Sequence, residues 1–351
     1  MQNKTAFITG ITGQDGTYLA EFLLGKGYKV HGLVRWDCVD ATKSLQVLEE
    51  AEERLELHFG DVTDANNINY LIKDVAPDEI YNLAALSHVK VSFETPSTTI
   101  DINAKGTLNI LESVRLLNLE KQVRIYQASS SEMFGSAMSP QNEDTKMEPC
   151  SPYGVAKLAA YHLAKIYREA YGLHVSNGIL FNHESPLRGE DFVTRKITRA
   201  VVAIEAGTQD KLVLGNLDSR RDWGHARDYI EGMWLMLQQD VPDDYVLATG
   251  ESRTVREFVE AAFAHTGVQI TWRGFGLDEI GVDSKTGKTL VTIDANFFRP
   301  KDVNALLGDS RKAHKVLNWN PKNSFKDLVS DMVNADRGDV WREDATWSKV
   351  G

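Results

Sequence analysis

The feature that most constrains this 351-residue chain is a glycine-rich turn placed directly after its first apolar run. The run Thr5–Thr9 is followed by Gly10-Ile11-Thr12-Gly13-Gln14-Asp15-Gly16, and the next residues have a helical pattern. Glycines at this spacing allow a tight turn and a close approach of backbone to a pyrophosphate, and the helix N-terminus adds free N–H groups and a partial positive charge. The segment therefore predicts a dinucleotide-binding strand–turn–helix unit.

Strand and helix patterns alternate from this turn to about residue 180. Besides the first strand, the expected strands are 28–34, 55–59, 79–83, 123–128 and 174–180, and the expected helices are 18–24, 107–117 and 155–170. Such alternation produces parallel βαβ units with helices on both faces of one sheet. The predicted fold class is α/β: a Rossmann-type doubly wound parallel sheet with a smaller mixed α/β substrate-binding lobe.

The alternation breaks after residue 180, and this break suggests the domain division. Helices are expected at 192–206 and 229–238 and a strand at 245–248, whereas the stretch after 251 has a mixed and irregular pattern. We predict that residues 1–181 and 222–250 form the dinucleotide-binding Rossmann domain. Residues 182–221 and 251–351 are predicted to form the substrate-binding lobe, which covers the carboxyl ends of the strands.

Charge and cysteine content exclude several classes of protein. The chain has 39 Lys and Arg against 50 Asp and Glu, a net charge of −11, which does not suit nucleic-acid binding. Its two cysteines, Cys38 and Cys150, have no metal-type spacing and predict reduced thiols rather than a disulfide or metal site. No leader pattern and no apolar run long enough to span a bilayer are visible. We therefore expect a cytoplasmic protein without a metal or membrane partner.

The residues that follow the second and third strands favour NADP as the dinucleotide. An acidic residue at the end of the second strand would bind the ribose 2′-hydroxyl of NAD, but this chain has Arg35, which suits a 2′-phosphate. A solvated surface arginine is the alternative, and the neighbouring Asp37 keeps it open. Asp61 and Val62 are expected to cover the adenine, with Asp61 accepting a hydrogen bond from its amino group.

Tyr153 and Lys157 form a Y-x-x-x-K motif at the start of an expected helix. Four-residue spacing places both side chains on one helical face. A nearby ammonium favours the phenolate, so the pKa of Tyr153 is expected to fall from ~10 toward neutrality. Tyr153 could then take the proton from a sugar hydroxyl while hydride leaves the same carbon.

A serine-rich turn, Ala128 to Gly135, follows the fifth expected strand, where open α/β sheets build their sites. Ser130 is predicted to hydrogen-bond the substrate hydroxyl alongside Tyr153. Glu132 is the informative residue, because a dehydratase needs a second base to remove the C5 proton while the C6 hydroxyl leaves. A plain dehydrogenase or C4-epimerase needs no such base, and an ordinary surface carboxylate is the alternative reading.

Basic residues gather after the sixth expected strand in this otherwise acidic chain. Such a cluster would suit a diphosphate, which Arg binds in a fork. A solvated helix face is the alternative, especially for Arg199 and Arg227. The cluster comprises Arg188, Arg195, Lys196, Arg199, Arg220, Arg221 and Arg227.

Taken together, these segments resemble the GDP-mannose 4,6-dehydratases, within the extended short-chain dehydrogenase/reductases. The resemblance extends from residue 9 to about 320. Its carriers include TGITGQDGTYLAEFLLGKGYKVHG, PDEIYNLAALSHVKVSFETP, YQASSSEMFG, SPYGVAKLAAY, GILFNHESPLRGEDFVTRKITRA, LGNLDSRRDWGHARDYIEGMWLMLQ and FFRPKDVNALLGDSRKAHKVLNW. It implies an NADP-dependent hydro-lyase acting on GDP-mannose or a close GDP-sugar.

The resemblance also implies residue roles. Ser130, Glu132 and Tyr153 stand at catalytic positions, with Lys157 as the partner of Tyr153. The implied cofactor positions are Gly10, Ile11, Thr12, Gly13, Gln14, Asp15, Gly16, Arg35, Asp61, Val62, Leu83, Ala84, Ala85, Leu86, Ser87, Lys157, His183 and Arg188. The implied substrate positions are Ser87, Asn182, Lys196, Arg221 and Arg299, the last two facing phosphate.

Departures from the family pattern keep alternatives open. Ser130 replaces the usual Thr, Leu187 replaces a usual Arg, and Arg35-Trp36-Asp37 replaces a double Arg with a Ser run. These changes leave GDP-heptose as an alternative substrate. A C4-epimerase or 4-keto reductase on the same fold is the alternative enzyme, and Glu132 argues against it. A dinucleotide sensor without activity is disfavoured, because Tyr153 and Lys157 are both present. The resemblance implies a homo-oligomer, either a dimer or a tetramer.

Overall fold

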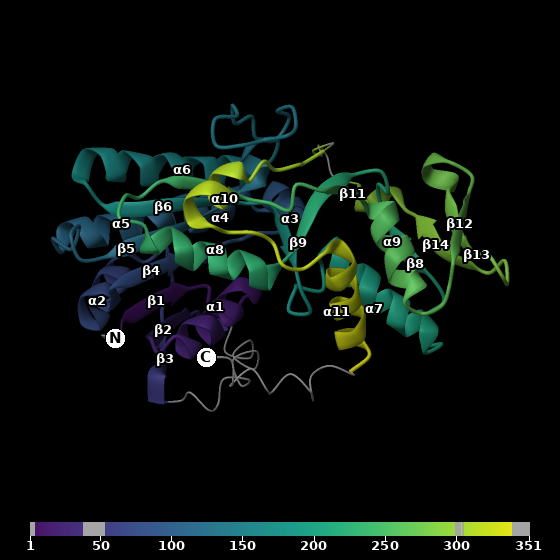
Figure 1. Cartoon of the computed structure of the whole chain (residues 1–351), viewed down its shortest axis with the longest axis horizontal. Coiled ribbons are helices and arrows are strands. Elements are labelled where there is room, and N and C mark those ends of the chain that lie inside the picture. Colours follow the sequence, from purple (N-terminus) through teal and green to yellow (C-terminus); the bar gives the residue numbers. More distant parts are fainter. Residues whose placement is uncertain (1–3, 38–52, 299–302, 304, 339–351) are drawn as a thin grey trace.

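The computed structural model describes residues 4–37, 53–298, 303 and 305–338, which form a larger and a smaller lobe side by side (Figure 1). Seven parallel strands make the sheet of the larger lobe. In spatial order they are β10 (Asp244–Leu247), β6 (His174–Leu180), β5 (Arg124–Ser130), β4 (Glu79–Asn82), β1 (Thr5–Thr9), β2 (Lys29–Val34) and β3 (Leu55–Phe59). The predicted doubly wound parallel sheet is confirmed.

Helices cover both faces of this sheet because each βαβ crossover must return along one face or the other. One face carries α1 (Gln14–Gly25), α8 (Ala226–Gln238) and α10 (Arg311–Leu317). The opposite face carries α2 (Ala65–Val75), α5 (Gly106–Leu116) and α6 (Pro152–Tyr171). Each predicted strand and helix of this lobe is present, with its ends shifted by a few residues.

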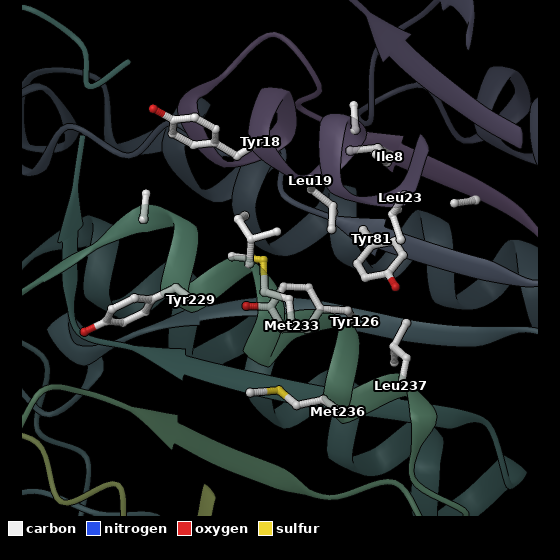
Figure 2. Close-up of a cluster of buried hydrophobic side chains, with 14 of the residues drawn as sticks. Ile8, Tyr18, Leu19, Leu23, Tyr81, Tyr126, Tyr229, Met233, Met236 and Leu237 are labelled. Atoms are coloured by element: carbon white, nitrogen blue, oxygen red, sulfur yellow. The ribbon is translucent and has the colours of Figure 1, made fainter. Parts of the chain in front are cut away.

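The core on the first face shows why α1 and α8 lie together although about 200 residues separate them. Leu19 and Leu23 of α1 and Met233 and Leu237 of α8 are fully buried in one core with Tyr126 of β5 (Figure 2). Burying a large apolar side chain contributes roughly 1.5–3 kcal/mol. This packing fixes the glycine-rich turn, which begins α1, at the carboxyl edge of the sheet.

The smaller lobe has its own hydrophobic core. A four-stranded sheet has the order β12 (Ile270–Arg273), β13 (Ile280–Asp283), β14 (Thr289–Ile293) and β8 (Leu212–Leu214). Helices α7 (Val193–Glu205), α9 (Val255–Ala264) and α11 (Phe325–Asp336) share one hydrophobic core with this sheet, and α11 packs against α7 and α9 (Figure 1). The described part of the stretch after 251 is therefore largely made of regular helices and strands, contrary to the expectation. Capping boxes at Thr254–Glu257 and Ser324–Asp327 start two of its helices and were a readable signal.

A small three-stranded sheet joins the lobes. Its order is β11 (Ser252–Thr254), β9 (Arg220–His225) and β7 (Asn182–Glu184). The chain also returns to the larger lobe near its end, because Ala313, Leu317 and Trp319 are buried in the core with α8. Short connecting helices α3 (Val89–Glu94) and α4 (Pro96–Ile100) follow β4. Within the residues described, no helix combines the length and apolar character needed to cross a membrane.

Candidate active site

A cleft of about 950 Å³ lies where the carboxyl ends of the large sheet meet the smaller lobe. Nearly all the predicted site residues line it. They are Gly10, Thr12, Gly13, Gln14, Asp15, Gly16, Arg35, Asp61, Val62, Leu83, Ala84, Ala85, Leu86, Ser87, Ser130, Glu132, Tyr153, Lys157, Asn182, His183, Arg188, Lys196 and Arg221. The side chain of Ile11 instead lies in the core beneath the turn, and Arg299 lies outside the described residues.

The glycine-rich turn is packed backbone against backbone. Gly10 has φ +72°, and a Cβ there would lie 2.8 Å from the amide nitrogen of Ala84. A Cβ on Gly16 would lie 2.5 Å from Cα of Ile11. Gly13 is the N-cap of α1 and has no side chain to cap the helix, so the first N–H groups of α1 remain for an anion. The turn thus has the shape that a pyrophosphate requires.

The first turn of α1 is hydrogen-bonded to the strand end that leads into the smaller lobe. Gln14 Nε2 donates to the carbonyl of His183 at 3.1 Å, and Ser185 Oγ donates to Gln14 Oε1 at 2.8 Å. His183 Nε2 lies 2.7 Å from Asp15 Oδ2. We call these four residues, Gln14, Asp15, His183 and Ser185, the cleft clasp. It joins the predicted cofactor turn to the segment that carries Asn182.

The surroundings of His183 in the cleft clasp favour its protonated form. Its Nδ1 lies 2.8 Å from the carbonyl oxygen of Phe181, which can only accept, and its Nε2 faces the Asp15 carboxylate. Burial opposes the charge, but the negative charge and hydrogen bond of Asp15 raise the pKa of His183 above its ordinary value. The same pair lowers the pKa of Asp15 despite its burial.

The predicted catalytic residues come from two adjacent elements. Ser130 ends β5 and caps the short helix at Ser131–Met133, its Oγ accepting from the Glu132 amide at 3.2 Å. Tyr153 lies in the first turn of α6, which Ser151 caps. Gly154 lets this turn approach, because a Cβ there would lie 2.7 Å from the carbonyl oxygen of Glu132. A tyrosine and a carboxylate therefore face one cleft.

These side chains are largely withdrawn from water. The exposed fractions are 8% for Tyr153, 9% for Glu132 and 4% for Lys157. The surface-carboxylate reading of Glu132 is therefore disfavoured, since a buried carboxylate is costly unless it has a role or a partner.

The expected lowering of the Tyr153 pKa is wrong for the protein alone. Burial raises the pKa of Tyr153 to about 12, and a hydrogen bond with Ser130 offsets only part of this rise. Burial also lowers the pKa of Lys157 to about 8. The Lys157 ammonium donates to the carbonyl of Ala128 at 2.8 Å and lies 5.9 Å from the centre of the Tyr153 ring. Desolvation exceeds the attraction between ammonium and phenolate that sequence spacing suggested.

The basic residues separate into cleft and surface groups. Arg221 is buried, and its guanidinium donates to the carbonyls of Arg220 and Val303, both at 2.9 Å. Lys196 Nζ lies 3.4 Å from the centre of the Phe297 ring. By contrast, Arg195, Arg199 and Arg227 pair with the carboxylates of Asp336, Glu190 and Glu21 and do not line the cleft.

Sequence reasoning missed the apolar wall of the cleft. Phe297, Phe298 and Trp223 line it from the smaller lobe, together with Leu214. Their positions in the sequence read as ordinary core, because an aromatic residue gives no local signal of facing a cavity. Only the meeting of β8, β9 and the segment after β14 places them together.

Comparisons with known proteins identify the family of this chain. The family model described as GDP-mannose 4,6 dehydratase matches residues 7–332. A GDP-mannose 4,6-dehydratase of Sinorhizobium fredii (strain HH103) is 55% identical over 338 residues, covering 95% of this chain and 96% of its own. A GDP-mannose 4,6 dehydratase of Drosophila melanogaster is 53% identical over 341 residues, covering 95% and 86%.

Solved structures share the fold at lower identity. The dTDP-glucose 4,6-dehydratase of Bacillus anthracis, solved in complex with NAD, has a TM-score of 0.78 and 20% identity, covering 96% of this chain and 97% of its own. The sequence matches confirm the predicted enzyme class, a GDP-mannose-type 4,6-dehydratase and hence a hydro-lyase. The chain belongs to the GDP-mannose 4,6-dehydratase family.

Proposed function

We propose that this chain converts GDP-mannose, or a close GDP-sugar, to the GDP-4-keto-6-deoxy sugar with loss of water, through internal hydride transfer from C4 to C6. The observation that carries the proposal is the pairing of buried Glu132 with buried Tyr153 at one end of a dinucleotide-shaped cleft. One residue serves oxidation at C4, and the other serves proton removal at C5.

The residues that line the cleft support NADP as the proposed cofactor. The close-packed turn at Gly10 and Gly16 and the uncapped start of α1 suit the pyrophosphate. Arg35 is exposed at the rim beside Asp61 and would hold the 2′-phosphate, although Asp37 also lies 3.3 Å from its Nε. When bound, the cofactor supplies a hydride acceptor and donor, and in its oxidised form a positive charge. That charge favours the phenolate form of Tyr153, whose pKa the protein alone raises.

The side chains then divide the proton transfers. Tyr153 takes the proton of the C4 hydroxyl as hydride leaves C4, which gives a ketone. The ketone acidifies C5–H, and Glu132 removes that proton. The C6 hydroxyl leaves as water, with its proton supplied by Glu132 or Tyr153. Hydride then arrives at C6 and a proton at C5, so no net reductant is consumed.

The smaller lobe is proposed to hold the GDP part of the substrate. Arg221 would bind the diphosphate, because its buried guanidinium is already fixed by two carbonyl acceptors and lines the cleft. Lys196 and Asn182 also line the cleft. Arg299, which lies outside the described residues, keeps its proposed phosphate role on the strength of the family pattern alone.

The test of the reaction is incubation with GDP-mannose, and separately with GDP-heptose, without added reductant. Mass spectrometry should detect loss of one water from the preferred sugar. Dehydration of neither sugar, or turnover only when NADPH is consumed, would contradict the proposal and favour the 4-keto reductase.

Cofactor choice has its own test. The protein purified as isolated should contain NADP(H), and Arg35→Asp should weaken NADP by about 2 kcal/mol, because a charge-assisted contact is replaced by repulsion. Extraction of mainly NAD from the native protein would contradict the assignment.

The division into two domains and the assembly into a homo-oligomer are also proposals. The separate cores of the two lobes support the predicted boundaries near residues 181, 221 and 250, but Ala313, Leu317 and Trp319, which were assigned to the smaller lobe, lie in the core of the larger lobe. Half-exposed Val155, Ile166 and Tyr171 along α6 support a homo-oligomer. Light scattering of the purified protein should give the mass of a dimer or tetramer, and a monomer would contradict it.

A further inference from the structure

Two imidazoles and a carboxylate converge on the large sheet outside the cleft. His31 lies in β2, and Glu56 and His58 lie in β3, the strand beside it at the end of the sheet. In the ladder His31 is paired with Glu56, and Leu33 with His58. Because side chains alternate along a strand, residues 31, 56 and 58 stand on the same face of the sheet. The register of the two strands therefore brings the side chains of His31, Glu56 and His58 together.

The donor atoms of this cluster lie at short distances. His31 Nδ1 is 2.7 Å from His58 Nε2. Glu56 places Oε2 3.8 Å from His31 Nδ1 and Oε1 3.8 Å from His58 Nε2. Two nitrogen ligands of a tetrahedral zinc ion lie about 3.3 Å apart, given zinc–nitrogen bonds of about 2.0–2.1 Å. The imidazoles would need to separate by roughly 0.6 Å, which is a small side-chain movement.

We propose that His31, Glu56 and His58 form a site for a divalent transition metal, with zinc as the best-suited ion. Two neutral imidazoles and one carboxylate are a known zinc ligand set, which leaves a further position for water. The site lies apart from the cleft, as none of the three residues lines it. It also departs from our expectation of no metal, which rested on cysteine spacing.

The surroundings of the cluster permit an ion to enter. The side chain of His31 is buried, with 6% exposed, that of His58 is partly exposed, with 13%, and that of Glu56 is 53% exposed. An ion can therefore arrive from solvent and be held against buried nitrogens. Lys29 Nζ, 3.3 Å from Glu56, competes for the carboxylate, but its side chain is itself 48% exposed and can turn to water.

A metal at this position would connect strands that lead to the adenosine end of the cleft. β2 ends at Val34, immediately before Arg35, and β3 ends at Phe59, immediately before the Gly60-Asp61 turn. A bond from each strand to one ion would hold these two strand ends in register. We therefore expect the bound metal to raise thermal stability without taking part in the reaction.

The experiment is titration of chelator-treated full-length protein with Zn²⁺ alone, in competition with a chromophoric chelator. Wild type should bind one tight zinc per chain, with an upward shift of Tm. His58→Gln should weaken that site by roughly 100-fold and Glu56→Gln by about 10-fold, through loss of one ligand each. His162→Gln removes an exposed imidazole from α6 and should leave zinc binding unchanged.

Two further measurements keep the result decisive. Co²⁺ bound to wild type should give the intense visible absorption of a tetrahedral site, and the double variant His58→Gln/Glu56→Gln should not. Circular dichroism of the variants checks that the fold is intact, which is expected because the amide is isosteric with the exposed Glu56 side chain and is no larger than the partly exposed His58 ring. Zinc binding by wild type no tighter than that of the double variant overturns the proposal.

Discussion

The two halves of the cleft are built in different ways. The cofactor half is made by backbone: Gly10 and Gly16 lie so close to neighbouring main chain that a single methyl group does not fit. The reaction half is made by buried side chains, among them Tyr153, Lys157 and Glu132, which are largely shielded from water. The cofactor half selects its ligand by shape, whereas the reaction half acts on the substrate through the proton affinities of its side chains.

This difference indicates which kind of substitution should disrupt each half of the cleft. A backbone site fails when volume is added, even if no functional group is lost. A side-chain site fails when one functional group is exchanged, even if the volume is unchanged. Substitutions that add volume without removing a functional group, or remove a functional group without changing volume, can therefore test this difference between the two halves.

The largest effect is expected for Glu132→Gln, which keeps volume and removes the base. Dehydration should fall on the order of 10²–10⁴-fold, while NADP and GDP-sugar still bind. The variant should still show NADPH absorbance from oxidation at C4. Tyr153→Phe should abolish that absorbance as well, because oxidation itself needs the phenol. Near-native dehydration by Glu132→Gln, followed by mass spectrometry, would remove the role given to Glu132.

The next effect concerns Lys157, whose burial lowers its pKa to about 8 from an ordinary 10.5. Between these pH values the unfolded chain binds a proton on Lys157 that the folded protein has lost, so the free energy of unfolding rises with pH. The Lys157→Met variant has no titrating group at this position, so this contribution to the rise of its free energy of unfolding is absent. The stability of wild type relative to the variant should therefore grow by on the order of 3 kcal/mol from pH 8 to 10.5. Urea unfolding of the cofactor-free proteins measures it, and a constant difference would contradict it.

The backbone half is tested by two glycines of the same helix. Gly16→Ala should lower the free energy of unfolding by about 2 kcal/mol and weaken NADP, because its Cβ would lie 2.5 Å from main chain. Gly25→Ala meets no atom within 4 Å and should be neutral or stabilise by up to about 1 kcal/mol. Calorimetric Tm and NADP affinity of both proteins decide it. Equal behaviour of the two variants would show that the turn is not held by close packing.

The smallest effect is expected at the cleft clasp. Asp15→Asn keeps the volume but removes the charge that stabilises the His183 imidazolium, so burial should then lower the pKa of His183. We expect a loss of about 1–2 kcal/mol in stability at neutral pH. Nuclear magnetic resonance titration of the His183 ring follows the change, and Asp15→Glu should restore part of it. An unchanged His183 pKa in Asp15→Asn would show that Asp15 is not its partner.

The sequence by itself determined the parts that depend on local spacing. Strand and helix periodicity with the turn at Gly10 to Gly16 predicts the parallel sheet and the dinucleotide end of the cleft, because both follow from neighbours along the chain. The four-residue interval between Tyr153 and Lys157, and the place of Glu132 after a strand, likewise predict which residues meet. These expectations needed no knowledge of distant contacts.

The burial of each site residue, and its contacts with residues distant in sequence, became known only from the tertiary structure. The pKa of Tyr153 is raised because packing removes water, a cost that no residue spacing reveals. Phe297 comes beneath Lys196, and His31 comes beside Glu56, only when segments far apart in sequence lie together. Desolvation and long-range contact are properties of the packed chain, because each depends on what surrounds a side chain in space and not on its neighbours in sequence.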